Sequence, residues 1–245
     1  MLAKIKSSAV VGVDALPVTV EVDISYGLPA FSTVGLAEGA VRESRERVKA
    51  AIKNSGYDFP NRRITVNLAP ADVKKEGAGY DLPMALGILT ASEILRSEKL
   101  ENYGVIGELS LDGSIRPAKG ILPMALAAQN AGLEGILVPI ANAEEAAVVA
   151  GIKIIGVKTL YEAVEFLVGI RELSPTTIDL RTIFQNNANY AVDFDEVKGQ
   201  EHVKRAMEIA AAGGHNILMK GPPGSGKTMM ARRLPTILPD LTFEE

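Results

Sequence analysis

A glycine-rich octapeptide near the end of the chain restricts the fold more than any other feature. It follows the pattern G-x-x-x-x-G-K-[ST] of a phosphate-binding loop and reads Gly221-Pro222-Pro223-Gly224-Ser225-Gly226-Lys227-Thr228, with Met229 next in the chain. Its glycines allow the backbone to curl so that successive N–H groups point at a β-phosphate. Lys227 is placed to reach the β- and γ-phosphates, and the hydroxyl of Thr228 can complete the shell of a Mg²⁺ ion. The motif therefore predicts binding of a nucleoside triphosphate together with Mg²⁺.

The residues around this loop indicate a strand before it and a helix after it. The apolar run 216–219 predicts a buried strand, and 229–234 predicts the helix, which Pro235 ends or kinks. A hydrolytic core also needs a second, acidic strand and an arginine for the developing charge. The acidic residues after the loop, Asp240, Glu244 and Glu245, do not follow an apolar strand. We therefore expect a truncated polypeptide that carries the nucleotide anchor without the hydrolytic machinery.

Composition excludes several other kinds of site. The chain has no Cys, which rules out disulfides, thiolate zinc sites and cysteine nucleophiles, and its two histidines are too few for a histidine metal centre. No stretch approaches the roughly 18 apolar residues of a membrane helix, so we expect no membrane span and a cytoplasmic location. The net charge of −4 gives no overall electrostatic footprint for nucleic acid. Contact with DNA would have to come from a local patch.

Hydrophobic periodicity predicts alternating strands and helices before the loop. Alternating residues indicate a hairpin of 4–13 and 17–24 around a turn at 14–15. The other predicted strands are 63–68, 105–109, 135–138 and 153–157, and the predicted helices are 37–55, 81–95, 120–130, 143–150, 160–168 and 201–212. This order is typical of an α/β fold with at least partly parallel pairing. Turn-forming residues at 174–189 predict a linker, so we expect domains at 1–170 and 193–245 joined by 171–192.

Basic residues form one line on the first predicted helix. They are spaced by three or four positions, which places them on one face: Arg42, Arg45, Lys49 and Lys53. One interpretation is a solvated flank paired with Glu43 and Glu46. The other is a basic ridge, continued at 62–63, that contacts phosphate or a neighbouring subunit. The sequence leaves both open.

The segment 195–200 and the alanine-rich helix after it, placed before the phosphate loop, resemble the AAA+ ATPases. In that superfamily this segment lies over the adenine of ATP, so the resemblance implies base contacts from Val197, Gly199 and Gln200. Further stretches, 39–44, 67–72 and 213–216, are similar to the magnesium-chelatase-like AAA+ family that contains ComM and YifB proteins. This resemblance covers the whole chain. It implies a hexameric ATPase in the full-length protein, acting on DNA as a branch-migration helicase in recombination and transformation.

The same resemblance implies an N-terminal domain with the fold of the Lon peptidase domain, the ribosomal protein S5 domain 2-like fold. Lon-type enzymes pair a serine nucleophile with a lysine base. Matching 75–82 and 111–117 to the two Lon segments puts Gly79 where the serine would be and Leu122 where the lysine would be. A slip of one residue brings in only Ala78, Tyr80, Ile121 or Pro123. We therefore expect a pseudo-peptidase domain that binds or assembles and does not cleave.

Two other functions remain open on the sequence alone. A magnesium-chelatase motor subunit, driving metal insertion into a porphyrin, would carry a similar motor. The Lon-like leading domain argues against it, because chelatase ATPase subunits resemble this family in the motor and not in such a domain. A non-enzymatic scaffold with a nucleotide-binding tail is the third reading.

Overall fold

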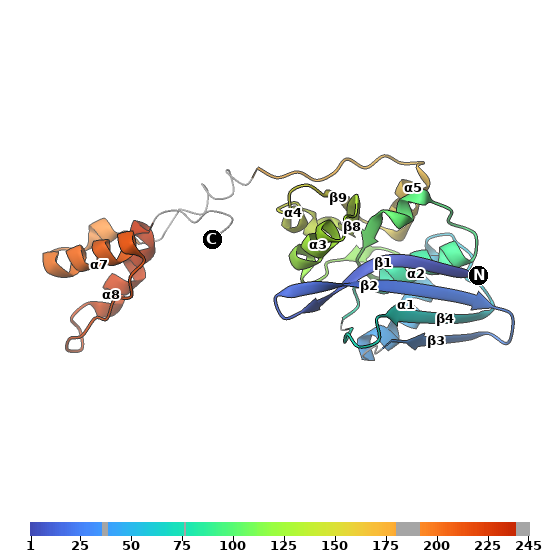
Figure 1. The fold of residues 1–245 in the computed structure, drawn as a ribbon, viewed down its shortest axis with the longest axis horizontal. Coiled ribbons are helices and arrows are strands. Elements are labelled where there is room, and N and C mark those ends of the chain that lie inside the picture. Colours follow the sequence, from blue (N-terminus) through green and yellow to red (C-terminus); the bar gives the residue numbers. More distant parts are fainter. Residues whose placement is uncertain (36–38, 76, 180–191, 239–245) are drawn as a thin grey trace. The chain divides into compact units, whose positions relative to one another are not determined.

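The computed structural model describes residues 1–35, 39–75, 77–179 and 192–238, which divide into two compact units. The larger unit is Met1–Ile178 and the smaller unit is Asp179–Glu245 (Figure 1). Residues 180–191 of the predicted linker and the acidic residues after Leu238 lie outside the described residues. None of the helices in these ranges is long and apolar enough to cross a bilayer.

The larger unit is built on a seven-stranded sheet with the order β3-β4-β2-β1-β5-β8-β9. The strands are β1 (Leu2–Val11), β2 (Asp14–Ser25), β3 (Ala30–Val34), β4 (Arg63–Ala69), β5 (Tyr103–Val105), β8 (Gly135–Pro139) and β9 (Lys153–Val157). Four neighbouring pairs are parallel, and the pairs β1–β2 and β2–β4 are antiparallel. The mixed α/β class predicted from the sequence is confirmed. The hairpin is also confirmed, but its turn lies at 12–13, where Gly12 has φ of +67°, because Val11 pairs with Asp14.

Helices pack against this sheet. They are α1 (Gly39–Asn54), α2 (Asp81–Ala91), α3 (Ile121–Asn130), α4 (Ala143–Ala146) and α5 (Leu160–Val168). Helix α2 packs against β1 and β2 and is buried along nearly its whole length, with Leu82, Leu86 and Leu89 fully buried. Helix α3 packs against the same two strands (Figure 1). The sheet and these helices bury two hydrophobic clusters, a larger one around α1, α2 and α5 and a smaller one around α3 and α4.

Three predicted elements have different bounds in the structure. The strand expected at 105–109 is split into β5 and β6 (Glu108–Leu109), and β6 pairs with β7 (Ile115–Arg116) in a separate two-stranded sheet. The chain leaves the main sheet at Gly107, whose N–H donates to the Gly79 carbonyl and whose carbonyl accepts from the Leu82 N–H, each at 2.9 Å. The helix expected at 81–95 ends at Ala91, because Glu93 adopts φ of +63°. The helix expected at 143–150 is only the four residues of α4.

The smaller unit contains α7 (Glu201–Gly213) and α8 (Lys227–Arg233) with the short 3-10 turns η3 (Phe194–Glu196) and η4 (Leu234–Ile237). Its core is small, consisting of Val197, Met207 and Met230 with partly buried neighbours. The strand predicted at 216–219 is wrong: no described strand pairs with this segment, and Leu218 is 93% exposed. An extended segment becomes a strand only when a neighbouring backbone satisfies its N–H and C=O groups.

A buried ion pair joins three elements of the larger unit. Asp81, the first residue of α2, is fully buried, and both of its carboxylate oxygens accept from Arg47 of α1, at 2.8 and 3.2 Å. The Leu109 N–H of β6 donates to the same carboxylate at 3.3 Å. Burial raises the pKa of Asp81, while the contacts with Arg47 and Ser44 act against this effect. The hydrogen bond to Asp81 raises the pKa of Arg47, so the guanidinium stays protonated.

Replacing Arg47 by Ala should destabilise the larger unit by about 3–5 kcal/mol at pH 7, because it leaves a buried carboxylate without its cation. The loss should shrink as the pH falls through the pKa of Asp81, since a carboxyl group with a raised pKa takes up a proton more readily in the folded protein than in the unfolded chain. Urea denaturation followed by circular dichroism at pH 7 and pH 4 measures both effects. Arg45→Ala is the matched control, since Arg45 lies on the same helix in an exposed pair with Glu46. Equal losses for both variants would contradict this account.

Candidate nucleotide-binding site

The phosphate loop follows residues 215–220, which have no regular secondary structure, and leads into helix α8. Gly224 and Gly226 adopt φ of +79° and +84°, a left-handed conformation that residues with a Cβ rarely adopt, and Gly226 caps the helix. Within the loop, the Ser225 hydroxyl donates to the Pro222 carbonyl at 2.9 Å. The predicted curled backbone is therefore present, with two glycines at the positions that require them.

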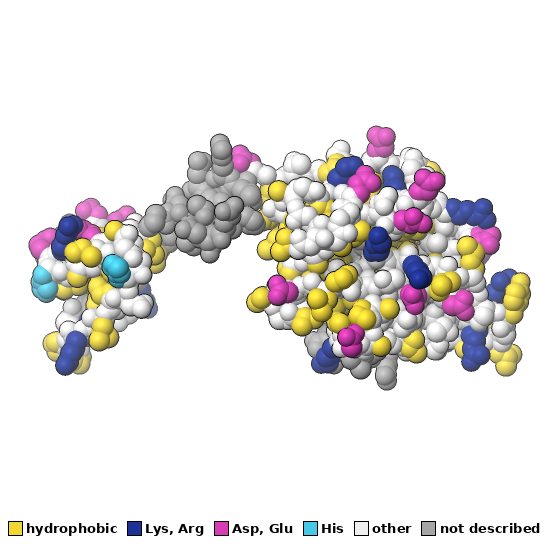
Figure 2. Space-filling model, in the orientation of Figure 1, with side chains coloured by type: hydrophobic (Ala, Val, Ile, Leu, Met, Phe, Trp, Pro, Cys, Tyr) yellow, Lys and Arg dark blue, Asp and Glu magenta, His cyan; other side chains and the backbone are white. Residues whose placement is uncertain are grey.

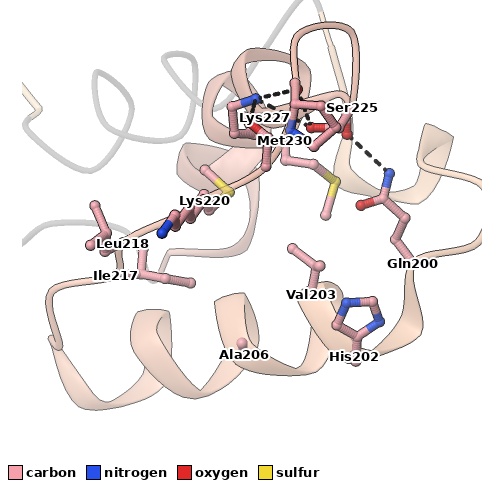
Figure 3. Close-up of a pocket in the computed structure, with 13 residues that line it drawn as sticks. Gln200, His202, Val203, Ala206, Ile217, Leu218, Lys220, Ser225, Lys227 and Met230 are labelled. Carbon is pink, nitrogen blue, oxygen red and sulfur yellow. Dashed lines mark hydrogen bonds between the residues drawn. The ribbon is translucent and has the colours of Figure 1, made fainter.

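Lys227 folds back over this loop (Figure 3). Its ammonium donates to the Gly221 carbonyl at 2.9 Å, the Pro222 carbonyl at 2.7 Å and the Ser225 hydroxyl at 3.2 Å. All three acceptors are neutral. Since a charged phosphate oxygen is the stronger acceptor for an ammonium group, a phosphate can replace them. The donor set fits a polyphosphate.

A cavity of about 360 Å³ adjoins the loop on the side of α7. Its wall combines the apolar side chains of Val203, Ile217 and Met230 with Lys227 at the loop (Figure 3). Gln200 reaches from the start of α7 to the loop, where its amide donates to the Ser225 carbonyl at 3.4 Å. Apolar walls with a few directed polar groups are typical of small-molecule sites. The arrangement can hold a flat base beside a phosphate group.

Arg233 connects the segment before α7 to the helix after the loop. Its guanidinium donates to the Asp193 carbonyl at 2.9 Å and the Met229 carbonyl at 3.1 Å, and it pairs with the Glu196 carboxylate. The hydrogen bond from Arg233 lowers the pKa of Glu196. The Phe194 N–H also donates to the Thr236 hydroxyl, at 3.1 Å. Residues 193–197 are therefore held against α8 and η4 by side-chain contacts.

The structure brings together only part of the set predicted from the sequence. Of the three predicted base contacts, Gln200 lines the cavity, whereas Val197 is 2% exposed in the core of the smaller unit and Gly199 does not line the cavity. Thr228 and Met229 are exposed at the start of α8 and lie outside the cavity wall. In the described part of the chain, no group of three or more His, Asp or Glu side chains could hold a metal. Thr228 is the protein ligand predicted for Mg²⁺, alongside phosphate oxygens.

Sequence reasoning missed two polar residues of the cavity wall, Lys220 and His202. Lys220 directly precedes the loop, and this position in the sequence was a usable signal for a second cation in the cavity wall. His202 lies in the first turn of α7, and its position at the cavity depends on how α7 packs beside residues 217–220. No local pattern indicates that packing.

The basic line on α1 is only partly described, because the side chain of Arg42 lies outside the described residues. Arg45 is half exposed and pairs with Glu46 at 3.4 Å. The Lys49 ammonium lies 6.0 Å from the centre of the Phe59 ring, and Lys53 is exposed. Of the three cations whose side chains are described, Arg45 and Lys53 are thus exposed to solvent.

Comparison with known proteins identifies the family. The family described as subunit ChlI of Mg-chelatase matches residues 20–142, and the one described as magnesium chelatase, subunit ChlI, matches 193–245. The chain is 46% identical, over its whole length, to the uncharacterized protein YifB of Salmonella typhimurium. It is 43% identical, over 98% of its length, to the competence protein ComM of Haemophilus influenzae.

These matches define a protein of the magnesium-chelatase ChlI type. The chain belongs to the magnesium-chelatase-like family of the YifB and ComM proteins. It spans 47% of the length of these two relatives. The family predicted from the sequence is confirmed.

A second similarity is to peptidases. Over 142 residues, 55% of this chain and 18% of the relative, the sequence is 30% identical to the Lon protease of Mycolicibacterium smegmatis. Gly79, predicted to replace the Lon serine, lines a cavity of about 330 Å³ in the larger unit. Leu122, predicted to replace the lysine, is 37% exposed and does not line that cavity.

Replacing Arg233 by Ala should loosen residues 193–197, because their contacts with α8 are removed. We expect backbone amides there to exchange on the order of tenfold faster, while amides of the larger unit keep their rates. Hydrogen exchange followed by mass spectrometry measures both. Arg232→Ala is the matched control, since Arg232 is the exposed neighbour of Arg233 in α8. Unchanged exchange at 193–197 would show that Arg233 does not hold this segment.

Proposed function

We propose that this chain is the nucleotide-binding N-terminal part of an AAA+ motor. The observation that carries the proposal is the ammonium of Lys227, held on the curled loop by weak neutral acceptors beside a cavity with apolar walls. Residues 221–229 bind the phosphates of ATP, Thr228 contributes its hydroxyl to Mg²⁺, and Gln200 approaches the base with Val197 and Gly199 behind it. Bound Mg²⁺ would neutralise charge on the phosphates.

The organisation of the chain is part of the proposal. Residues 1–170 form a Lon-peptidase-like domain without peptidase activity, 171–192 form a linker, and 193–245 begin the AAA+ domain. Similarity to Lon protease supports the first assignment, and the match of residues 193–245 to magnesium chelatase supports the last. In the whole protein, ATP hydrolysis by a hexamer drives movement on DNA during recombination. The similarity to a protein named for competence supports this reading.

Metal insertion into a porphyrin is the second candidate, because both matching families are described as magnesium-chelatase subunits. It ranks lower because relatives aligned along nearly the whole chain include YifB and ComM proteins. ATPase stimulation by forked DNA favours the first function, and stimulation by a porphyrin with Mg²⁺ favours the second.

Lys227→Ala should weaken nucleotide binding by this chain about ten- to a hundredfold, because one charge-assisted contact is worth about 1.5–3 kcal/mol. Titration with a fluorescent ATP analogue in the presence of Mg²⁺ measures the dissociation constant. Lys198→Ala is the control, since Lys198 is exposed close to the site and does not line the cavity. Equal affinity of the Lys227 variant and the unchanged chain would contradict the assigned role.

Replacing both Arg45 and Lys53 by Glu in the full-length protein should weaken binding to forked DNA and reduce its stimulation of the ATPase. For each phosphate contact that is lost, the dependence of log K on log salt should flatten by about 0.9 on duplex DNA. Glu replacements of Lys6 and Lys158, which are exposed elsewhere on the larger unit, should have little effect. If DNA affinity is unchanged but hexamers are lost on a sizing column, the basic residues of α1 would instead belong to a subunit interface.

A further inference from the structure

Strand β1 has one edge that is only partly paired. It pairs with β2 along its whole length, from Leu2 opposite Asp23 to Val11 opposite Asp14. On its other side it pairs with β5 at a single position, Lys6 opposite Gly104. Beyond that point β5 ends, and no described strand lies against residues 8–11 of β1.

One hydrogen bond shows the direction of the backbone groups at this edge. The Ser8 carbonyl accepts from the Tyr80 hydroxyl at 3.2 Å, so it points away from β2. Residues two apart in a strand direct their N–H and C=O groups to the same side. The backbone groups of Val10 therefore point to the same open side as those of Ser8.

Two adjoining cavities follow this edge. One, of about 330 Å³, lies beside Ser8 and Gly79, and the other, of about 780 Å³, continues past Val10 and Val11. Both are lined by Tyr80, Lys119 and Met124, so they form one groove. Figure 2 shows hydrophobic side chains gathered over the free end of the β1–β2 hairpin. Val11 and Leu16 are 49% and 42% exposed there.

The chemistry of the groove identifies its occupant. A strand edge is satisfied by another polypeptide backbone, which presents alternating donors and acceptors at the matching spacing. The apolar wall suits apolar side chains. Among the described lining residues the charges balance, with Asp72 and Glu108 against Lys74 and Lys119, so these residues supply no excess positive charge to select a polyanion.

We propose that this groove binds an extended, apolar polypeptide segment as an added strand on β1. Gly79 lines the same cavity as Ser8 and offers no nucleophile, so the bound segment is held and not cut. This peptide site lies in the larger unit and does not depend on the nucleotide site. A failure of ATP binding would therefore leave the peptide site unaffected, and a failure of peptide binding would leave the nucleotide site unaffected.

The test uses the 245-residue chain and a fluorescein-labelled octapeptide in which valine and threonine alternate between two terminal lysines. Fluorescence anisotropy should show saturable binding. A variant carrying Val11→Asp and Leu16→Asp should bind about tenfold or more weakly, because it places charge where apolar side chains are buried. Both positions are exposed, so circular dichroism should show an unchanged fold. Ile170→Asp, at a residue that is 77% exposed and outside the groove, should bind within about twofold of the unchanged chain.

A second probe separates strand pairing from general hydrophobic contact. In this probe prolines replace the threonines, which removes their N–H donors, and it should bind about tenfold more weakly. Equal binding of both peptides, or equal binding by the Asp variant, would overturn the proposal. So would an absence of saturable binding. The chain could instead self-associate without binding the peptide, and the Asp variant could abolish this self-association. That result would show that a second copy of the chain covers the groove, and it would also overturn the proposal.

Discussion

The larger unit depends on the way that one buried carboxylate is satisfied. Asp81 starts α2 inside the core, where an isolated charge is strongly disfavoured, and it is held by Arg47 of α1 and the N–H of Leu109 in β6. Three elements that are distant in sequence are therefore fixed around one residue. Tyr80, which directly precedes Asp81, donates a hydrogen bond from its hydroxyl to the carbonyl of Ser8. The ion pair is thus adjacent in the chain to Tyr80, which lines the groove beside β1.

The smaller unit is held together differently. Its few buried residues make a small core, and single polar side chains supply the remaining connections: Arg233 to residues 193–196, and Gln200 to the loop. Few buried apolar contacts mean a low free energy of local opening. Lys227 makes its contacts with the loop itself, so the loop keeps its curled form without support from a sheet. A loop of this kind can exchange internal acceptors for phosphate oxygens with little rearrangement elsewhere.

The sequence predicted the elements whose signals are local. Periodicity identified the hairpin, helix α2 and the later strands, because each buries one repeating set of residues, and the phosphate-loop motif is itself a local pattern. Prediction failed where a distant contact decides the structure. The division at Gly107 depends on its hydrogen bonds to Gly79 and Leu82, and an apolar run such as 216–219 cannot show whether a neighbouring strand is present. For the same reason, the sequence did not predict that His202 lines the cavity. Lys220 could have been predicted, because it directly precedes the phosphate loop.

An open strand edge is normally an aggregation hazard, and the surroundings of β1 limit that hazard while leaving room for a peptide. The unpaired part is short, and the loops around Gly79 and Lys119 flank it, so the groove is recessed. Association of two sheet edges needs a longer stretch of unpaired backbone than residues 8–11 offer, whereas a short extended segment can pair with them. The Tyr80 hydroxyl already donates a hydrogen bond to the Ser8 carbonyl, and the backbone of a bound segment would compete with Tyr80 for that acceptor. The same features that discourage edge-to-edge association therefore select for a single added strand.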